Sequence, residues 1–339
     1  MTDSLRAEVV PPRRKSTWLL LVGLTAPLAA LSMCERTEKM TVFTPPTLPK
    51  VKAVVQPAPE PARVISSELK LVFRAGDHSY VKLSSTEALP RGKAKIVKDE
   101  RAVHALWAAD ASALPSWVGT KVFVDNDCTA TITRLHYVSR MSIENLEYTE
   151  PGRTVSDAMA ERGVFIAGEL DGCDGTYARS AALPKVVVPE TRPDDAELVK
   201  KAKRELLRSP AAKETERVWV EDYQSTETWT SQAQYDIRTF RHPLTAQTWI
   251  SIHAWNGSGC GDPSVNIWGL FRVDADGTLF TAQIRDLGDM AKIHQIIDIE
   301  GDGGFELIGE PWMPLDTVVT DSHGDVLETL ELPYDGCPC

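Results

Sequence analysis

The sequence predicts an α+β fold that is rich in β-strands, with antiparallel sheets in a sandwich-like or barrel-like arrangement and a few short helices. Three observations carry this prediction. Apolar runs of strand length recur along the chain, and some of them alternate with polar residues at a period of two. Turn signals such as Asn256-Gly257 and Asp276-Gly277 separate these runs. Segments with the helical spacing of apolar residues are few.

The composition is that of a globular, acidic protein. The chain has 339 residues, of which 42% are hydrophobic and 25% charged, so neither a disordered chain nor a small disulfide scaffold fits. Its net charge of -11 argues against a nucleic-acid partner, which would favour a basic face. Residues 262–339 contain 16 acidic and 3 basic residues, and such an acidic end suits solubility, a hard cation or a basic partner.

Residues 1–34 predict a signal peptide or a membrane anchor. Arg13, Arg14 and Lys15 precede an almost wholly apolar stretch over 18–31, which is the layout of an export signal. The stretch is at the short limit for a helix that spans a membrane, so cleavage and retention both stay open. Because the basic residues come first, we expect the rest of the chain outside the cytoplasm, anchored in the cell envelope or secreted.

The segment Leu31-Ser32-Met33-Cys34 resembles the bacterial lipoprotein signal. In that family the cysteine after the apolar run is lipidated and becomes the new amino terminus. The resemblance implies lipidation of Cys34 and a tether to the membrane. An uncleaved anchor, or ordinary cleavage near Ala30 or Ser32, remains an alternative.

A proline-rich linker over 35–62 follows the signal, and the remainder is expected to divide near residue 190. The prolines of the linker favour an extended polyproline II conformation. Beyond it, we expect a β-rich α+β domain over 63–190. An antiparallel β domain with an acidic C-terminal part is expected over 191–339.

The first folded part is expected to combine strands with two short helices. Apolar residues over 102–107 share a helical face after Asp99, which predicts a helix over 100–110. A shorter helix over 156–162 would end at Gly163. The expected strands cover 68–74, 120–125, 128–138, 163–170 and 184–188.

The second folded part begins with a helix over 195–208 and continues as a meander of strands. Asp194 and Glu197 have the spacing of a capping box at the start of that helix. Short strands at this spacing predict a sandwich or a barrel-like sheet. The expected strands cover 217–223, 235–240, 246–254, 265–273, 278–284, 294–299, 305–310, 316–320 and 326–332.

Five further cysteines lie in the predicted folded part, and an exported chain is in a compartment where disulfides form. Cys128 begins one predicted strand and Cys173 follows another, so antiparallel pairing would bring the two thiols together. Cys260 is expected to pair with Cys337 or with Cys339, and the sequence leaves open which of the two.

One motif carries recognisable chemistry, a glycine-punctuated loop with acidic residues at positions 1, 3, 5 and 9. Calcium takes six to eight oxygen ligands in flexible geometry, and alternating carboxylates in a tight loop can converge on one ion. The glycines permit the turn and expose a backbone carbonyl. The sequence therefore predicts a structural calcium site, with an acidic hairpin turn without an ion as the alternative. The candidate ligands are Asp298, Glu300, Asp302, Gly304 and Glu306.

The same loop resembles the calcium loop of FG-GAP and VCBS repeats, which lies between two strands. Asp298, Asp302, Gly303 and Glu306 match that family's pattern D-x-D-x-D-G-x-x-D/E, and Glu300 stands where the pattern has an aspartate. The resemblance covers about 17 residues and one copy of the motif. It implies a local calcium loop, and neither a propeller fold nor an adhesive function.

The function predicted from these features is that of an envelope-tethered or secreted binding or structural protein. Its expected partners are the membrane, through the N-terminal anchor or a lipid, and a protein or glycan ligand. The sequence holds no nucleophile elbow, phosphate-binding loop, dinucleotide fingerprint or zinc-protease motif, so an enzyme is not favoured. An exported hydrolase whose site is assembled from distant loops is the alternative. The tryptophans of the second half are expected in a core rather than on a ligand-binding face.

Overall fold

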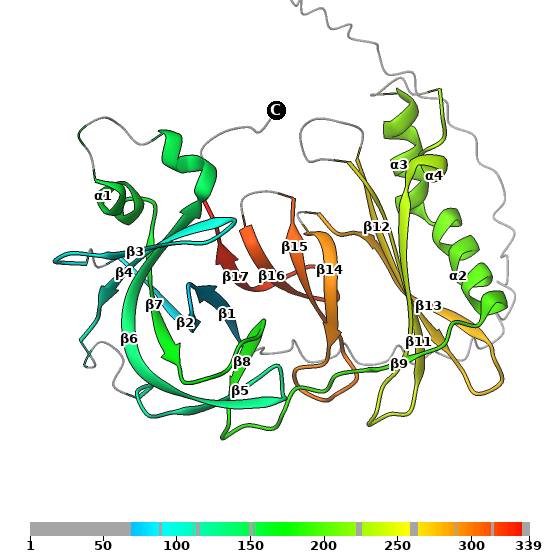
Figure 1. Ribbon diagram of the computed structural model, residues 1–339. Helices are drawn as coiled ribbons and strands as arrows, with labels where there is room; N and C mark the ends of the chain where they lie inside the picture. The colour runs from blue at the N-terminus through cyan, green and yellow to red at the C-terminus, as the bar shows by residue number, and fades with distance from the viewer. Residues whose placement is uncertain are drawn as a thin grey trace, which may run out of the picture. The chain divides into compact units, whose positions relative to one another are not determined.

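The computed structural model describes residues 69–333 except 88–89, 111, 113–115, 149–151, 153, 222–225, 258–263, 289 and 313–314. All of these belong to one compact unit, Arg63–Cys339. The described residues form three antiparallel sheets and a few short helices, so the predicted β-rich α+β fold is confirmed (Figure 1). The predicted signal, the linker, Cys34, Cys260, Cys337 and Cys339 lie outside the described residues.

Six of the described strands close into a barrel. The pairings run β5-β8-β1-β2-β7 and return to β5 through β6, which is fifteen residues long. One edge of β6 pairs with β7, and the other edge pairs first with β5 and then with β4, which carries β3 (Figure 1). The strands are β1 (Lys70–Ala75), β2 (His78–Thr86), β3 (Lys95–Lys98), β4 (Ala102–Ala108), β5 (Lys121–Val124), β6 (Cys128–Ser142), β7 (Val164–Leu170) and β8 (Tyr177–Ser180).

The barrel has an apolar interior because alternate residues of its strands point inward. Val81, Val122 and Ile132 belong to this interior cluster. Gly168 of β7 faces Ile132, and a Cβ atom there would lie 2.7 Å from the Ile132 side chain. The close approach of β6 and β7 therefore requires glycine at this position.

A five-stranded sheet carries the described helices of the second half on one face. Its order is β13-β12-β11-β10-β9, and Ala202 and Leu206 of α2 pack against it together with Trp219 of α3. Asp195 caps α2 by accepting the N–H groups of Glu197 and Leu198. The elements are β9 (Glu190–Arg192), α2 (Ala196–Arg208), α3 (Pro210–Glu221), α4 (Trp229–Gln232), β10 (Gln234–Arg241), β11 (Thr248–Asn256), β12 (Val265–Val273) and β13 (Leu279–Asp286).

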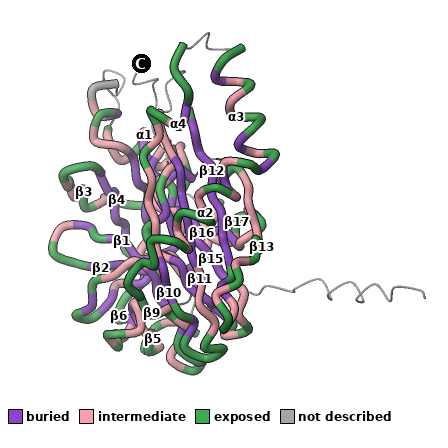
Figure 2. Tube along the Cα trace, turned by 90° about the vertical axis from the view of Figure 1, so that its right-hand side faces the viewer, coloured by how far each residue is buried: buried purple, intermediate pink, exposed green. Residues whose placement is uncertain are grey.

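A four-stranded sheet, β14 (Met290–Ile297), β15 (Glu306–Pro311), β16 (Leu315–Asp321) and β17 (Val326–Glu331), is buried on both faces. Leu307 and Val318 pack in a cluster with Trp268 of the five-stranded sheet. Their neighbours Ile308 and Val319 pack in another cluster with residues of the barrel's outer face. Because successive side chains point to opposite faces, this sheet is apolar on both sides and lies between the other two (Figures 1 and 2).

Two of the predicted elements are wrong in type. Residues 100–110 were predicted as a helix but contain strand β4, whose residues are nearly all buried. Leu106 packs in the cluster between the barrel's outer face and the four-stranded sheet, whereas Val103 and Trp107 pack on the opposite side against Met159 of α1 (Val155–Ala160). A strand with both faces covered has no simple period, which explains the error.

The predicted strand over 217–223 is wrong because residues 217–221 belong to helix α3, which runs from Pro210 to Glu221. Residues 184–188, also predicted as a strand, contribute one isolated bridge, Val187 to Asp298. The predicted helices over 156–162 and 195–208 are confirmed as α1 and α2. The remaining predicted strands are present with shifted ends. Trp219, Trp229 and Trp268 are buried, as expected for core residues, whereas Trp249, Trp255 and Trp312 are half-buried.

Among the described residues, none of the helices has the length and apolar character that crossing a membrane would require.

Candidate functional site

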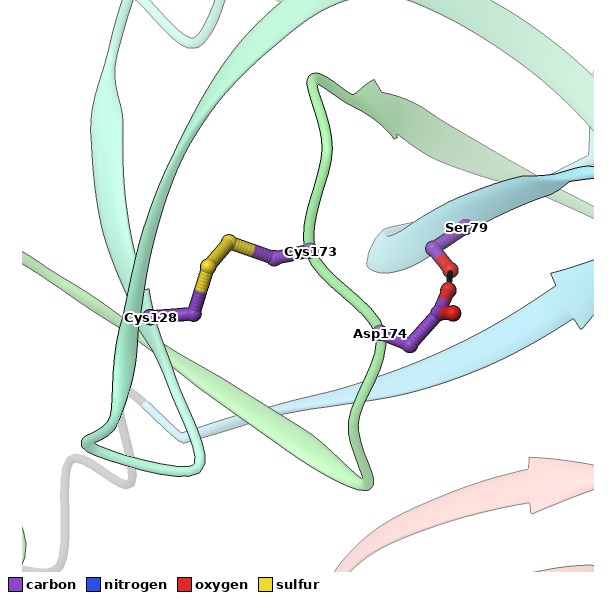
Figure 3. Close-up of a disulfide and its surroundings, with 4 residues drawn as sticks. All are labelled: Ser79, Cys128, Cys173 and Asp174. Carbon is purple, nitrogen blue, oxygen red and sulfur yellow. Dashed lines mark hydrogen bonds between the residues drawn. A yellow bond between two sulfur atoms is a disulfide. The ribbon is translucent and has the colours of Figure 1, made fainter.

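The predicted disulfide between Cys128 and Cys173 is present (Figure 3). Cys128 is the first residue of β6 and Cys173 follows β7, and their Cα atoms are 6.1 Å apart. Beside the bridge, the Ser79 hydroxyl donates to the Asp174 carboxylate, which also lies 3.4 Å from an Arg74 guanidinium nitrogen (Figure 3). The crosslink thus joins two strands of the closed barrel.

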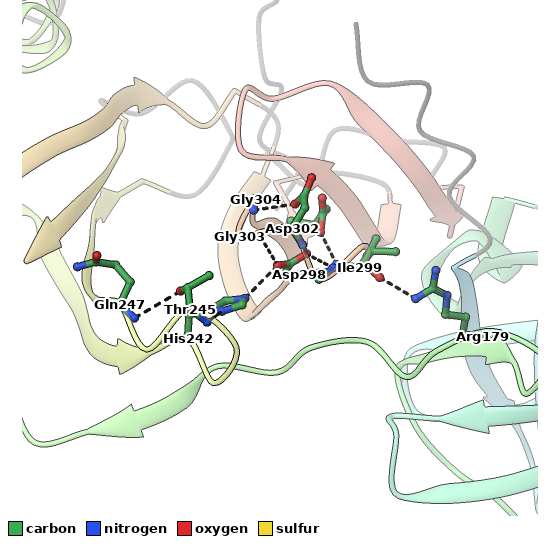
Figure 4. A network of polar contacts seen from close by, with 11 residues as sticks. Arg179, His242, Thr245, Gln247, Asp298, Ile299, Asp302, Gly303 and Gly304 are labelled. Atoms are coloured by element: carbon green, nitrogen blue, oxygen red, sulfur yellow. Dashed lines mark hydrogen bonds and ion pairs between the residues drawn. The ribbon is translucent and has the colours of Figure 1, made fainter. Parts of the chain in front are cut away.

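The predicted calcium loop connects β14 to β15, and the carboxylate of Asp298 holds it by accepting hydrogen bonds from its backbone. The Asp298 side chain is 0% exposed. Oδ1 accepts the N–H groups of Gly301 at 2.6 Å and Asp302 at 3.3 Å, and Oδ2 accepts the N–H of Gly303 at 2.7 Å (Figure 4). Gly301 and Gly303 have φ angles of 73° and 90°, which glycine adopts without strain.

A buried histidine completes the hydrogen bonds of Asp298. His242 Nε2 lies 3.0 Å from Asp298 Oδ2, and both side chains are fully buried. His242 Nδ1 accepts the N–H of Thr245 at 3.1 Å, so the ring proton is on Nε2 and is donated to Asp298 (Figure 4). The pair joins the loop to the turn after β10.

The barrel also holds this loop. Arg179 of β8 is buried, and its Nη1 donates to the carbonyl oxygen of Ile299 at 2.6 Å (Figure 4). Its Nη2 lies 3.6 Å from Glu300 Oε1. The loop is therefore fixed by the barrel on one side and by His242 of the five-stranded sheet's turn on the other.

Two of the other predicted calcium ligands, Glu306 and Asp302, also accept N–H groups of the loop's own backbone. Glu306 Oε2 accepts the N–H of Ile299 at 2.8 Å, and Asp302 Oδ1 accepts the N–H of Gly304 at 2.9 Å. Within the described ranges, no group of three or more His, Cys, Asp or Glu side chains is placed to hold a metal ion. Calcium binding stays a prediction, because an ion at Asp298 would have to replace donors that already occupy its oxygens.

A pocket of about 690 Å³ lies near this loop, where the barrel, the five-stranded sheet and the four-stranded sheet meet. The sequence does not predict this pocket. Five separate stretches of the chain contribute to its wall. The lining residues are Asp125, Asp127, Tyr177, Val188, Pro189, Thr191, Arg192, Pro193, Asp194, Ile237, Arg238, Thr239, Phe240, His294, Gln295 and Ile296.

The turn between β5 and β6 builds one side of the pocket. Asp125 and Asn126 have positive φ angles of 47° and 66°, which aspartate and asparagine tolerate better than most residues. The Asn126 amide donates to the carbonyl oxygen of Val186 at 2.6 Å and accepts the N–H of Val186 at 3.1 Å. Asp127, the last residue of this turn, is exposed on the lining. The turn therefore both anchors the chain that leads into the pocket and supplies a carboxylate.

The pocket lining contains more carboxylates than cations that lack a carboxylate partner. Arg192 lies 2.6 Å from Glu190, and the Arg238 guanidinium contacts Asp236, so both arginines have a carboxylate partner. The lining also contains three aspartates, Asp125, Asp127 and Asp194.

Tyr177 is in contact with this negative charge. Burial, and then the charges of Asp125 and Asp127, raise the pKa of the Tyr177 phenol above its usual value. Tyr177 therefore lies buried beside the two aspartates of the β5–β6 turn.

Comparison with known proteins gives no family for this chain. No protein-family model matches it, and neither the curated proteins nor the solved structures contain a match. Its function is accordingly argued from the geometry of the site.

Proposed function

We propose that this chain is an exported binding protein that takes a cationic ligand into the pocket at the junction of the barrel and the two sheets. The observation that carries the proposal is the acidic lining of a pocket whose volume, about 690 Å³, suits a small ligand or a short peptide. Clefts lined by one sign of charge concentrate ligands of the opposite sign.

The exported location rests on two features. The first is the charged and then apolar N-terminal segment, which has the layout of an export signal. The second is the Cys128–Cys173 disulfide, since such crosslinks persist in oxidising compartments outside the cytosol. We propose lipidation at Cys34 as the tether.

An exported hydrolase is supported less well by the pocket. Its described lining includes one histidine, His294, whose Nε2 lies 3.5 Å from Glu310 Oε2. The lining includes neither serine nor cysteine among its described residues, so it offers no pair of such a nucleophile with a base. Binding is the function that these groups favour.

Calorimetry with spermidine as a cationic probe tests the binding function. We expect saturable binding to the full-length protein, weakened by added salt and at least tenfold weaker in the double variant Asp127→Asn/Asp194→Asn. Glu100→Gln is the matched control, because Glu100 is an exposed carboxylate outside the pocket lining. Absence of spermidine binding, or equal loss in the control, would overturn the proposal.

Mass spectrometry of the native protein tests the tether. We expect a mature chain that begins at a lipid-modified Cys34 and retains the Cys128–Cys173 crosslink. A chain that keeps residues 1–34 would show that the tether is a retained anchor and not a lipid. A full-length chain with every thiol reduced would refute the proposed export.

A further inference from the structure

The free edge of strand β14 runs along the pocket. β14 is the edge strand of its sheet and pairs with β15 on the other side. Just past its end, the N–H and C=O of Asp298 both exchange hydrogen bonds of 2.9 Å with Val187, on the edge away from β15. Backbone groups of a strand alternate between its two edges, so those of Ile296 point to the same free edge as those of Asp298.

Pro189 explains why this edge is not covered at Ile296. Val187 lies opposite Asp298 in an antiparallel bridge, and the same register would bring residue 189 opposite Ile296. Residue 189 is a proline, which has no N–H to give to a ladder. The chain instead turns to β9, whose residues Glu190–Arg192 pair with β10.

Arg238 covers the same edge on the other side of Ile296. Its guanidinium donates to the carbonyl oxygens of His294 at 2.9 Å and Ile293 at 2.8 Å. The edge is thus occupied by a side chain at one end and by Val187 at the other. Between them, Ile296 lines the pocket with a backbone donor and acceptor that no described strand pairs.

We propose that the pocket takes an extended peptide segment with basic side chains, one residue of which pairs with the backbone of Ile296 in the place that Pro189 leaves open. This proposal rests on the proposed function and names its ligand. A strand that adds to a sheet edge gains main-chain hydrogen bonds, whereas the neighbouring side chains determine specificity.

Charge selects the basic character of the peptide. Asp127 and Asp194 are exposed carboxylates on the pocket lining, and no cation is paired with either of them among the described residues. A lysine or arginine next to the pairing residue can reach such groups, since alternate side chains of an extended segment lie on the same side. An acidic peptide would meet repulsion there instead.

The test compares a short blocked peptide, Ac-TKVKT-NH2, with its analogue N-methylated at the central valine. N-methylation removes the N–H that would donate to the carbonyl of Ile296 and leaves the charge unchanged. We expect the parent peptide to bind at least tenfold more tightly than this analogue. An analogue N-methylated at the lysine after the valine is the control, because the N–H of that residue points to the opposite edge of the peptide, and it is expected to bind like the parent.

Hydrogen exchange and spermidine separate failure of this inference from failure of the proposed function. We expect the parent peptide to slow exchange of the Ile296 amide, and spermidine to bind without doing so. If spermidine and both peptides bind with no effect of valine methylation, the pocket is a cation site and the strand pairing is refuted. If neither spermidine nor peptide binds, the proposed function itself is refuted.

Discussion

Two hairpin turns of the four-stranded sheet are built in the same way and differ in what surrounds them. In the β14–β15 turn, Asp298 accepts the N–H groups of the third and fourth residues after it. In the β16–β17 turn, Asp321 does the same with Gly324 at 2.7 Å and Asp325 at 2.9 Å. Gly324, like the glycines of the first turn, has a positive φ.

The environment of the two carboxylates separates the turns. Asp298 is fully buried and also accepts hydrogen bonds from Gly303 and His242. Asp321 is also buried, but 10% of its side chain is exposed, and its neighbour His323, 3.6 Å away, is mostly exposed. The comparison teaches that the acidic and glycine pattern of the first turn, which resembles a calcium loop, is also the pattern that lets one carboxylate close a turn onto backbone N–H groups.

The largest expected effect is that of Asp298→Ala. The substitution leaves the His242 Nε2–H and backbone N–H groups of the loop buried without an acceptor. We expect the free energy of unfolding to fall by about 3–5 kcal/mol. Urea denaturation measures it, with Asp298→Asn, which keeps one carbonyl oxygen, as the milder comparison. A loss below about 1 kcal/mol would show that the buried carboxylate does not hold the turn.

His242→Leu is expected to have the next largest effect. It replaces the imidazole by an apolar side chain of similar size. This removes the acceptor of the Thr245 N–H and the donor to Asp298 Oδ2, which retains the N–H of Gly303. A charge-assisted hydrogen bond contributes about 2 kcal/mol, and we expect a loss of that order in the same urea experiment. Equal stability of variant and wild type would mean that the backbone N–H groups alone satisfy Asp298.

Asp321→Ala, in the β16–β17 turn, is expected to lower the free energy of unfolding less than the two substitutions above. Because part of the Asp321 side chain is exposed beside the exposed His323, water can reach the N–H groups of Gly324 and Asp325 once the carboxylate is removed, and we expect a loss of about 1 kcal/mol. Asp276→Ala, in an exposed turn of the five-stranded sheet, is the control, since its carboxylate accepts a single N–H, that of Thr278. A loss at Asp321 as large as that at Asp298 would remove the distinction between the two turns.

Calcium is expected to have the smallest effect. Because donors occupy the oxygens of Asp298, an ion would bind weakly at the loop, and calcium at its dissociation constant stabilises by about 0.4 kcal/mol. We expect calorimetric melting to rise by about 1 °C at millimolar calcium in the wild type and not in Asp302→Ala. No shift in either protein removes the calcium site, and an equal shift in both places the ion elsewhere.

Much of the fold was predictable because short strands separated by turn residues leave a clear pattern. The meander from β10 to β17 follows that pattern, and Cys128 and Cys173 were placed correctly from the ends of their strands. The pattern failed where tertiary contacts decide the structure. β4 is covered on both faces, so its apolar residues fit a helix as well as a strand.

The pocket could not be predicted because its wall comes from five separate stretches of the chain. The sequence has one local indication of the pocket, Val188-Pro189, because a proline ends the strand predicted over 184–188. The acidic loop was found readily, but the sequence could not show that His242, 56 residues earlier, donates to Asp298. A buried pair of this kind depends on which sheets pack together.

Closure of the barrel sets the order in which the chain can fold. β1 begins at Lys70, yet its edge away from β2 pairs with β8, which ends at Ser180. The outer face of the barrel is then covered by residues as late as Leu330. Contacts of such long range form slowly, since the intervening chain must first be made and brought together. A newly synthesised chain consequently stays open for longer, as the export proposed above would require.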